Sequence, residues 1–307
     1  MPSTTMKQLA ALARLSRPWF MLNGLGLYVL GAMVARYEGY TLSPALYLWG
    51  QLFVSALQLM AHFLNEYWDE EGDRRNLHRT PFSGGSGVLP EGLLSRETVF
   101  TAAMICLAVG LGAAAVLVAQ YPTSPAVWVM MSLIFLGLFF QSSPPVALMS
   151  TGYGEITTSI VFAGLVPAFG HLLLGNQASV LILLTTAPLV LLHVATLIAF
   201  SLPDFESDSA SGKRTLVVRL GQDAGANLHN ILLAASLALT ALGSVLGLPI
   251  RVAISAAFIA PLVMLQIITV RRLQRGEPAS FFQLTLLAAL LFGLSVYLNA
   301  FSFWVIG

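Results

Sequence analysis

Residues 45–73 read ALYLWGQLFVSALQLMAHFLNEYWDEEGD, an apolar run that passes directly into an acidic stretch. The run from about 45 to 66 is long enough to cross the hydrocarbon core of a bilayer as a helix. Asn65, Asp69 and Asp73 then recur at every fourth residue. In a helix each step of four turns the side chain by only about 40° and climbs about 6 Å, so the three groups line one stripe about 12 Å long.

Carboxylates at the edge of a membrane-spanning segment are costly and usually functional. Their oxygen atoms suit a hard cation such as Mg²⁺, with phosphate oxygens filling the remaining positions. The alternative interpretation is a solvated helix end that merely carries charge. A second acidic pair far along the chain, Asp204 and Asp208, repeats the spacing of four and argues against that alternative.

Composition indicates the class of protein. The chain has 307 residues, of which 57% are hydrophobic and only 9% are charged, as is typical of an all-α polytopic membrane protein. No polar linker divides residues 1–307, so we expect a single domain. The net charge of +1 gives no reason to expect a nucleic-acid partner, and the single cysteine, Cys106, excludes an intrachain disulfide framework.

Nine apolar runs have the length of a membrane span, and they predict about nine transmembrane helices in one bundle. They cover approximately residues 18–35, 45–66, 98–119, 125–141, 153–174, 179–202, 226–247, 250–270 and 280–304.

The distribution of charge predicts the orientation of these spans. With a cytoplasmic N-terminus, thirteen of the fifteen basic residues lie on the cytoplasmic side, and only Arg36 and Arg251 lie opposite. The positive-inside rule favours this arrangement. It places the two longest polar segments, residues 69–97 and 203–225, on the cytoplasmic face of the cell membrane. We expect these segments to cap one active site.

Two facing carboxylate clusters are suited to hold a pair of Mg²⁺ ions bridged by a diphosphate. Basic residues follow each cluster and would neutralise charge on a departing diphosphate. They are Arg74, Arg75 and Arg79 after the first cluster, and Lys213 and Arg214 after the second. A polar site above an apolar bundle predicts a substrate with an anionic head and a long hydrocarbon tail, and an isoprenyl diphosphate fits that description.

The two motifs resemble those of the UbiA superfamily of intramembrane prenyltransferases. The first is Asn65-x-x-x-Asp69-x-x-x-Asp73, and the second is DFESDSASGKRT at residues 204–215. Residues 82–87 (FSGGSG) and 144–155 (PPVALMSTGYGE) are similar to one branch, the 1,4-dihydroxy-2-naphthoate prenyltransferases of menaquinone synthesis. The chain differs from that branch at Gln141 and at residues 150–151, where a tyrosine and an arginine are expected, so other acceptors stay open.

The resemblance implies a role for each motif residue. The implied ligands of two Mg²⁺ ions and the diphosphate are Asn65, Asp69, Asp73, Asp204 and Asp208, the four aspartates being catalytic together with Lys213. Lys213 would contact the diphosphate directly, and Arg74, Arg79 and Arg214 would support substrate binding. Loss of diphosphate would leave an allylic cation, which an electron-rich aromatic carbon attacks. Aromatic faces such as those of Tyr67, Trp68 and Tyr153 would stabilise the cation.

Two other polar residues, Glu155 and His62, permit two interpretations each. Glu155 suits either acceptor binding or a helix-start carboxylate. His62 lies almost on the face of Asn65, so it either touches the acceptor or makes an interhelical hydrogen bond. His171 and His193 stand singly in apolar runs, and we expect them to be packing residues. The glycines of residues 84–87 suggest a phosphate cradle, a lid or a turn.

Several other functions are compatible with parts of this pattern. An ion-coupled transporter also needs buried carboxylates, but the ionisable groups here gather at one face rather than at the bilayer midplane. The same fold would also serve to prenylate another phenolic acid, a glycerol phosphate lipid or a tetrapyrrole. A terpene cyclase would use the same metal site without an acceptor.

Overall fold

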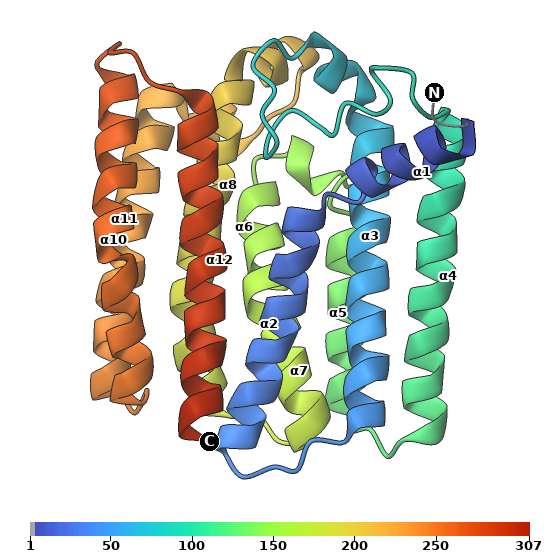
Figure 1. Cartoon of the computed structure of the whole chain (residues 1–307), viewed down its shortest axis with the longest axis vertical. Helices are drawn as coiled ribbons and strands as arrows, with labels where there is room; N and C mark the ends of the chain where they lie inside the picture. Colours follow the sequence, from blue (N-terminus) through green and yellow to red (C-terminus); the bar gives the residue numbers. More distant parts are fainter. Residues whose placement is uncertain (1–3) are drawn as a thin grey trace.

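The computed structural model describes residues 4–307, which form a bundle of long, roughly parallel helices without a β-strand in that range (Figure 1). The helices are α1 (Thr4–Leu15), α2 (Pro18–Tyr37), α3 (Pro44–Arg75), α4 (Arg96–Gln120), α5 (Pro125–Phe139), the 3₁₀ turn η1 (Leu148–Ser150), α6 (Gly154–Ser159), the π-helical segment η2 (Ile160–Leu165), α7 (Val166–Gly175), α8 (Val180–Ser211), α9 (Leu216–Leu220), α10 (Gln222–Val245), α11 (Ile250–Gln274) and α12 (Phe281–Ile306).

Each of the nine apolar runs coincides with a long helix, and α6, η2 and α7 together form the rod for the fifth run. Seven rods in the described range are long and apolar enough to cross a membrane: α2, α4, α6–α7, α8, α10, α11 and α12. Helix α5 is shorter, with 15 residues, and α3 ends in the acidic stretch. The prediction of an all-helical membrane bundle is confirmed.

Serine and proline residues that favour helix initiation occur at the N-termini of several long helices. The hydroxyl oxygens of Ser43, Ser95, Ser179 and Ser280 each accept a hydrogen bond from a backbone N–H in the first turn of α3, α4, α8 and α12. These hydrogen bonds satisfy N–H groups that have no partner within the helix. Proline also begins α2, α3 and α5, where its missing N–H costs nothing. Local sequence therefore fixes where the rods begin.

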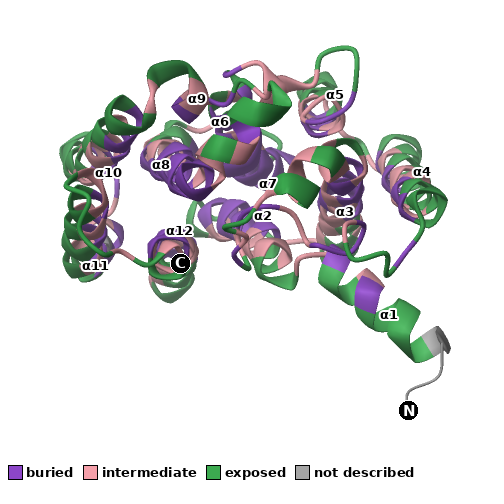
Figure 2. Cartoon of the chain, turned by 90° about the horizontal axis from the view of Figure 1, so that it is seen from above, coloured by how far each residue is buried: buried purple, intermediate pink, exposed green. Residues whose placement is uncertain are grey.

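Small residues let α2 approach α7 closely. A β-carbon at Gly31 would lie 2.0 Å from the carbonyl oxygen of Pro167, and one at Gly170 would lie 2.8 Å from the carbonyl oxygen of Tyr28. Without a hydrophobic force between helices in lipid, such close van der Waals packing is what holds them together. Seen from above, buried residues face the middle of the bundle and exposed ones face outwards (Figure 2).

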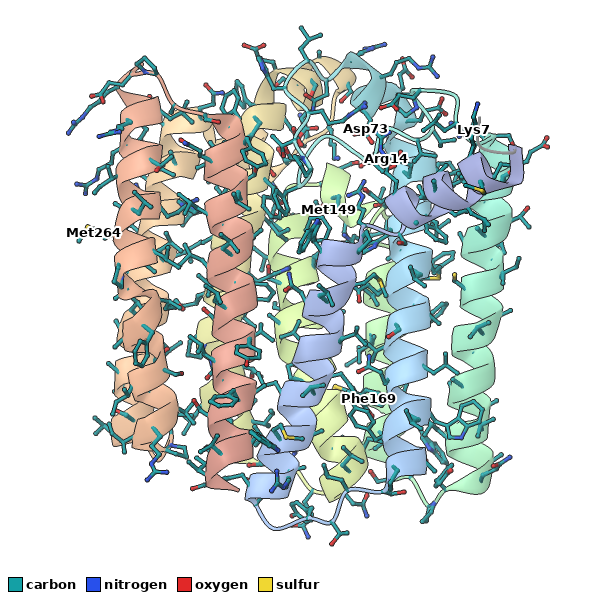
Figure 3. The ribbon with its side chains drawn as sticks, viewed as in Figure 1. Lys7, Arg14, Asp73, Met149, Phe169 and Met264 are labelled. Atoms are coloured by element: carbon teal, nitrogen blue, oxygen red, sulfur yellow. The ribbon has the colours of Figure 1, made fainter. Side chains whose placement is uncertain are left out.

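The outward faces of the bundle are apolar. Ile105 and Val109 on α4, and Ile254 and Phe258 on α11, are 42% to 73% exposed. Met264 on α11 likewise projects away from the bundle (Figure 3). Large apolar side chains exposed on rods of spanning length match a surface that faces lipid. The chain is an integral membrane protein.

One end of the bundle carries the long polar segments. Helix α1 lies across this end beside the C-terminal end of α3, and Lys7, Arg14 and Asp73 gather there (Figure 3). Arg36, at the end of α2, and Arg251, at the start of α11, lie at the opposite end. The structure thus separates the basic residues as the charge pattern predicts, while the assignment of this end to the cytoplasm stays a prediction.

Candidate active site

A cavity of about 560 Å³ opens at the polar end, between the ends of α3 and α8. Its rim is polar, and its deeper wall is mostly apolar. The apolar lining consists of Phe20, Ala61, Trp68, Phe82, Leu138, Met149, Phe162, Leu197, Phe200 and Ala210. A cavity with this division suits a molecule that has an anionic head and an apolar body.

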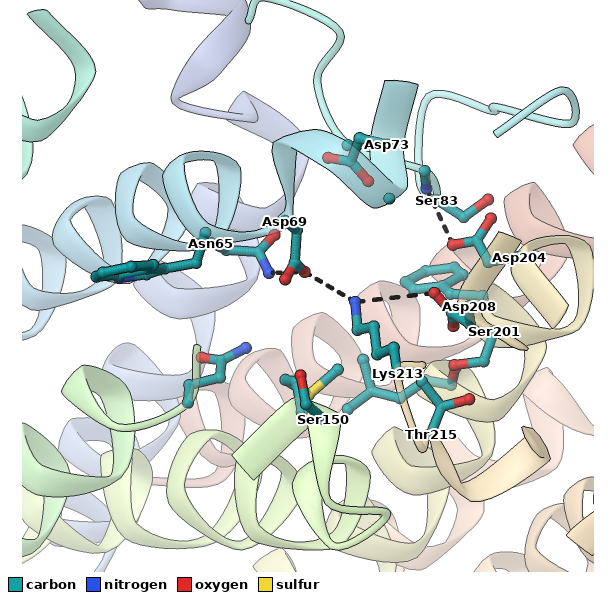
Figure 4. A pocket seen from close by; sticks show the side chains of 18 of the residues that line it. Asn65, Asp69, Asp73, Ser83, Ser150, Ser201, Asp204, Asp208, Lys213 and Thr215 are labelled. Carbon is teal, nitrogen blue, oxygen red and sulfur yellow. Dashed lines mark hydrogen bonds and ion pairs between the residues drawn. The ribbon is translucent and has the colours of Figure 1, made fainter. Parts of the chain in front are cut away.

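The stripe on α3 lines this cavity (Figure 4). Asn65 Nδ2 donates a hydrogen bond to Asp69 Oδ2 at 2.8 Å and another to Ser142 Oγ at 3.1 Å. Asp73, one further turn along, lines the cavity too. The helical spacing read from the sequence therefore brings Asn65, Asp69 and Asp73 to one wall.

Asp204 and Asp208 on α8 line the same cavity. Asp204 is tied to the polar segment after α3, because its Oδ1 accepts from Asn76 Nδ2 at 2.8 Å and its Oδ2 from Gly84 N–H at 3.0 Å. The glycine-rich loop thus binds a carboxylate through a backbone amide. The contact brings the two long polar segments together over one site, as the sequence predicts.

Lys213 joins the two carboxylate clusters. Its Nζ donates to Asp69 Oδ2 at 2.8 Å and lies 4.0 Å from Asp208 Oδ1 (Figure 4). Gly212 ends α8 with a φ of 75°, which turns the chain back so that Lys213 N–H bonds the Asp208 carbonyl at 2.9 Å. Burial alone would lower the pKa of Lys213, but the charges of Asp69 and Asp208 outweigh it and raise that pKa. The ammonium is therefore charged.

Asp73 is the unsatisfied member of the site. Its Oδ2 is buried and has no hydrogen-bond partner among the described residues. The backbone of Gly85 (φ 75°) lies so close that a β-carbon there would be 1.9 Å from this oxygen. A buried oxygen of this kind calls for a bound cation or donor.

The donor set fits a hard divalent cation. Both cluster walls present carboxylates, the ligands that Mg²⁺ prefers, and Asp73 keeps an unpartnered oxygen. Arg75 on α3 also lines the cavity, where it pairs with Glu71 at 2.5 Å. Within residues 4–307, no three carboxylate, histidine or cysteine groups already converge on one point. The Lys213 ammonium lies between Asp69 and Asp208, and Asp204 is turned to the loop. A Mg²⁺ ion here would be coordinated partly by these carboxylates and partly by phosphate oxygens of the substrate.

Two of the expected arginines do not line the cavity. Arg79 Nε donates to the Gly84 carbonyl at 2.8 Å and its Nη2 donates to the Asp73 carbonyl at 2.9 Å, so it braces the loop. Arg74 is exposed and pairs with Glu70 at 2.7 Å on its own helix. In this structure Arg79 supports the loop and Arg74 pairs within its own helix, and their role in substrate binding stays a prediction.

Arg214, Tyr153 and Glu155 also lie outside the cavity. The Arg214 side chain is exposed. Tyr153 is 57% exposed, and its ring lies under the guanidinium of Arg219 at 5.1 Å rather than over the site. Glu155 is buried, and its Oε1 accepts from Leu216 N–H at 2.8 Å, at the start of α9. Glu155 thus contacts the start of α9 rather than only its own helix α6, and its Oε2 has no partner among the described residues. Of the three aromatic residues first expected to face the site, Trp68 lines the cavity.

The two histidines that line the cavity are His62 and His193. His62 Nδ1 lies 3.0 Å from the carbonyl oxygen of Ser16, in the turn between α1 and α2, so its bond reaches this turn rather than another helix. His193, which we expected to be a packing residue, hydrogen-bonds Ser159 Oγ at 2.9 Å. His171 lies at the opposite end of the bundle and pairs with Glu38.

Arg17 is a lining residue that the sequence did not single out. Its backbone has a φ of 49°, a strained conformation that aims the side chain at α3. Its Nη2 donates to Asn65 Oδ1 at 3.3 Å and to Glu66 Oε2 at 3.2 Å. The position directly before Pro18, where the first span begins, is the only signal for it in the sequence.

Comparisons with known proteins agree with this geometry. The model of the UbiA prenyltransferase family matches residues 25–296. A curated relative, 1,4-dihydroxy-2-naphthoate octaprenyltransferase of Escherichia coli (strain K12), is 29% identical over 235 residues, which cover 74% of this chain and 73% of the relative.

Solved structures of UbiA homologues share the fold. One from Archaeoglobus fulgidus, bound to GPP and Mg²⁺, superposes with a TM-score of 0.66 at 18% identity and covers 94% of this chain and 99% of its own. The apo structure of a homologue from Aeropyrum pernix K1 gives a TM-score of 0.63 at 20% identity and covers 91% and 97%.

Proposed function

The chain belongs to the UbiA prenyltransferase family, and from that premise we propose that it transfers an isoprenyl chain from a prenyl diphosphate to 1,4-dihydroxy-2-naphthoate or a similar quinone precursor. The observation that carries the proposal is the arrangement of Asp69, Asp208 and Lys213 at the mouth of an apolar cavity. With Mg²⁺ on its carboxylates, such a mouth would bind a charged diphosphate, and the apolar side chains below it would exclude water from a hydrocarbon tail.

The proposed metal ligands are Asn65, Asp69, Asp73, Asp204 and Asp208. When bound, two Mg²⁺ ions would link these oxygens to the diphosphate and neutralise the charge of the leaving group. The Archaeoglobus fulgidus homologues, bound to GPP or DMAPP with Mg²⁺, support this assignment. The free Oδ2 of Asp73 supports it independently.

Lys213 would stabilise the diphosphate as it leaves. Its ammonium stands between Asp69 and Asp208, so a diphosphate bound at these carboxylates lies within its reach. The bond between prenyl C1 and oxygen breaks with its electron pair going to the diphosphate. The gain in negative charge on that oxygen is greatest in the transition state, where a fixed cation contributes most.

The apolar wall would protect the allylic cation that remains. Phe82 and Phe200 stack with ring centroids 6.0 Å apart, and Phe20 meets Phe200 edge-on at 5.8 Å. All three rings line the cavity. Aromatic faces stabilise a cation, and the absence of polar groups on them keeps water from capturing it. These phenylalanines take the role first expected of Tyr153.

The acceptor completes the reaction. A carbon of its electron-rich ring supplies the electron pair for the new bond to C1, and the ring regains aromaticity by losing carbon dioxide or a proton. The naphthoate relative supports a bicyclic dihydroxy acid as acceptor. His62, whose ring lines the cavity beside Phe20, is a proposed contact of the acceptor.

The orientation of the protein follows from its charges. We place the polar end of the bundle, with the N-terminus and both long polar segments, in the cytoplasm because the basic residues cluster there. Both substrates would then enter from the cytoplasmic side of the cell membrane, and residues 1–307 would act as one domain.

The test is direct. Purified protein is incubated with Mg²⁺, prenyl diphosphates of several lengths and a panel of aromatic acids, and products are identified by mass spectrometry. We expect the prenylated naphthoquinol, with release of diphosphate that depends on the added acceptor. Efficient prenylation of a monocyclic benzoate alone would reassign the acceptor, and acceptor-independent diphosphate release would indicate a cyclase.

A further inference from the structure

His193 forms part of the deep wall of the cavity. It lies on α8 eleven residues before Asp204, which is about 16 Å along a helix. The residue is 7% exposed, lines the cavity, and is held between Phe162 and Phe292 with ring centroids at 5.6 Å and 4.5 Å. The distance from Asp204 leaves room for a diphosphate, the reacting carbon and an aromatic ring.

The hydrogen bonds around Ser159 fix which ring nitrogen of His193 carries the proton. Ser159 Oγ lies 2.6 Å from the carbonyl oxygen of Glu155, and a carbonyl cannot donate, so the hydroxyl proton lies between these two oxygens. The same Oγ is 2.9 Å from His193 Nδ1 and has only lone pairs left to offer. Nδ1 therefore carries the proton, and Nε2 of the neutral ring carries the lone pair.

That lone pair has no partner in residues 4–307. No hydrogen bond reaches His193 Nε2, yet this atom is not sealed in protein, because the ring lines the cavity. His229 on α10 makes a useful contrast. Its Nδ1 bonds the Ala195 carbonyl at 2.8 Å and its Nε2 is also unpartnered, but that atom is fully enclosed and does not line the cavity.

The backbone beside Ser159 is also unusual. The π-helical segment η2 begins at Ile160, directly after Ser159, and contributes Phe162 to the cavity. Short π-helical segments occur often at functional sites. Here the segment adjoins the residue that fixes the proton of His193, so two independent features mark this part of the wall.

An isoprenyl tail cannot satisfy His193, because a hydrocarbon offers no hydrogen-bond donor. A phenolic hydroxyl does. We propose that Nε2 of His193 accepts a hydrogen bond from a hydroxyl group of the aromatic acceptor, an inference that rests on the proposed function. The bond orients the ring below the prenyl carbon, and it strengthens as the attacking ring becomes electron-poor. His193 would thus select acceptors that carry a hydroxyl at this position.

Steady-state kinetics with matched substrates test the proposal. The acceptors are 1,4-dihydroxy-2-naphthoate and the two analogues that lack one hydroxyl, and the proteins are wild type, His193→Phe, His193→Asn and the control His229→Phe. We expect His193→Phe to lower kcat/KM for the dihydroxy acceptor by about tenfold to a hundredfold, the usual effect of removing a hydrogen-bond partner from a buried group. The KM for the prenyl diphosphate should not change.

The decisive readout is the coupling between variant and substrate. Loss of a hydroxyl lowers the reactivity of the ring in every variant, so the comparison is between the two losses. For one of the two analogues the loss in wild type should exceed the loss in His193→Phe by about tenfold to a hundredfold. His229→Phe should leave the preference for hydroxyls intact. An equal loss with all three acceptors, or no loss at all, would overturn the proposal and assign His193 to packing or to a water molecule.

Two further measurements keep the result interpretable. Thermal melting in detergent shows whether each variant is folded, and if His193→Phe is not, His193→Asn and the wild-type analogue series decide. Failure of the wild type to prenylate any aromatic acid would refute the proposed function itself. Normal wild-type transfer with hydroxyl preference unchanged in the His193 variants would refute the role of His193 alone.

Discussion

Each end of the helix bundle holds a hydrogen-bonded acidic cluster, but the two clusters differ in how their carboxylate oxygens are satisfied. At the end opposite the cavity, Glu38 Oε2 lies 2.5 Å from His171 Nε2, and its Oε1 accepts from Ser179 Oγ. At the cavity, Asp73 Oδ2 has no partner among the described residues. The single ammonium of Lys213 forms ion pairs with both Asp69 and Asp208.

The difference separates a structural connection from a binding site. Glu38 follows α2, His171 lies on α7 and Ser179 caps α8, so the far cluster joins three helices with both carboxylate oxygens in use. A carboxylate that satisfies the buried His171 and the cap of α8 in this way stabilises the fold and keeps no free oxygen for a ligand. The near cluster holds more negative charge than its lysine neutralises, as a cation site requires.

The largest effect is expected at the cavity carboxylates. Asp69→Asn and Asp208→Asn should each lower turnover by about a thousandfold or more, because the leaving diphosphate loses a metal ligand. Thermal melting in detergent checks that each variant is folded, because each change also weakens an ion pair with Lys213. Excess chelator should abolish activity of the wild type. Product formation is measured at saturating substrates.

The matched control for these variants is Asp223→Asn, which changes an exposed carboxylate at the start of α10. It should retain full activity. Near-native turnover by Asp69→Asn or Asp208→Asn, or by the wild type in chelator, would contradict the metal assignment and remove the distinction drawn between the two ends.

Lys213→Met should have the next largest effect. The variant keeps much of the side-chain stem but removes the charge next to Asp69, and turnover at saturating donor should fall by about a hundredfold. Arg214→Met changes an exposed cation that does not line the cavity, and its turnover should fall less than threefold. Equal behaviour of the two variants would return Lys213 to the role of a structural counter-ion.

A smaller effect should follow from the close approach of Gly85 to Asp73. A β-carbon at Gly85 would lie 1.9 Å from Asp73 Oδ2, so Gly85→Ala must displace either the loop or the carboxylate. We expect kcat/KM for the donor to fall by about tenfold, because a ligand displaced by even 1 Å weakens the site.

Gly92→Ala is the control for backbone strain. Gly92 also has a positive φ, 66°, but nothing lies within 4 Å of its added β-carbon. Both substitutions should lower the free energy of unfolding by about 1 kcal/mol, because an alanine is strained in the left-handed backbone conformation of these glycines. Only Gly85→Ala should affect donor kinetics, and a similar loss of activity in both variants would assign the effect to the loop as a whole.

The carboxylate walls could be predicted from sequence because they depend on local geometry. The spacing of Asn65, Asp69 and Asp73 fixes one face of a helix whatever that helix packs against. Asp204 and Asp208 follow the same rule. The apolar runs predicted the helix bundle, and their flanking charges predicted that the polar segments would lie together at one end.

Contacts between distant segments could not be predicted in the same way. Whether Arg79 faces the substrate or the loop depends on where the Gly84 carbonyl lies, and Tyr153 turns away from the site because Arg219 on α9 meets its ring. His193 lies in an apolar run like any packing residue. Its role depends on Ser159, which is 34 residues away in the chain.

The smallest effect on catalysis is expected at the far cluster. Glu38→Gln weakens the bond to the buried His171, and His171→Phe removes that bond, which should cost about 1–3 kcal/mol of stability and lower the melting midpoint by a few degrees. Glu277→Gln, at a 45% exposed side chain whose arginine partners are 3.7 Å and 4.0 Å away, should change stability little. All three variants should keep kcat/KM for both substrates within about twofold of wild type, because the far cluster does not line the cavity. Melting in detergent and initial rates on the same preparations measure both quantities. If His171→Phe lowered kcat/KM without lowering stability, the two ends would be coupled through α7 and α8, since a purely structural connection acts on activity only through the fraction of protein that is folded.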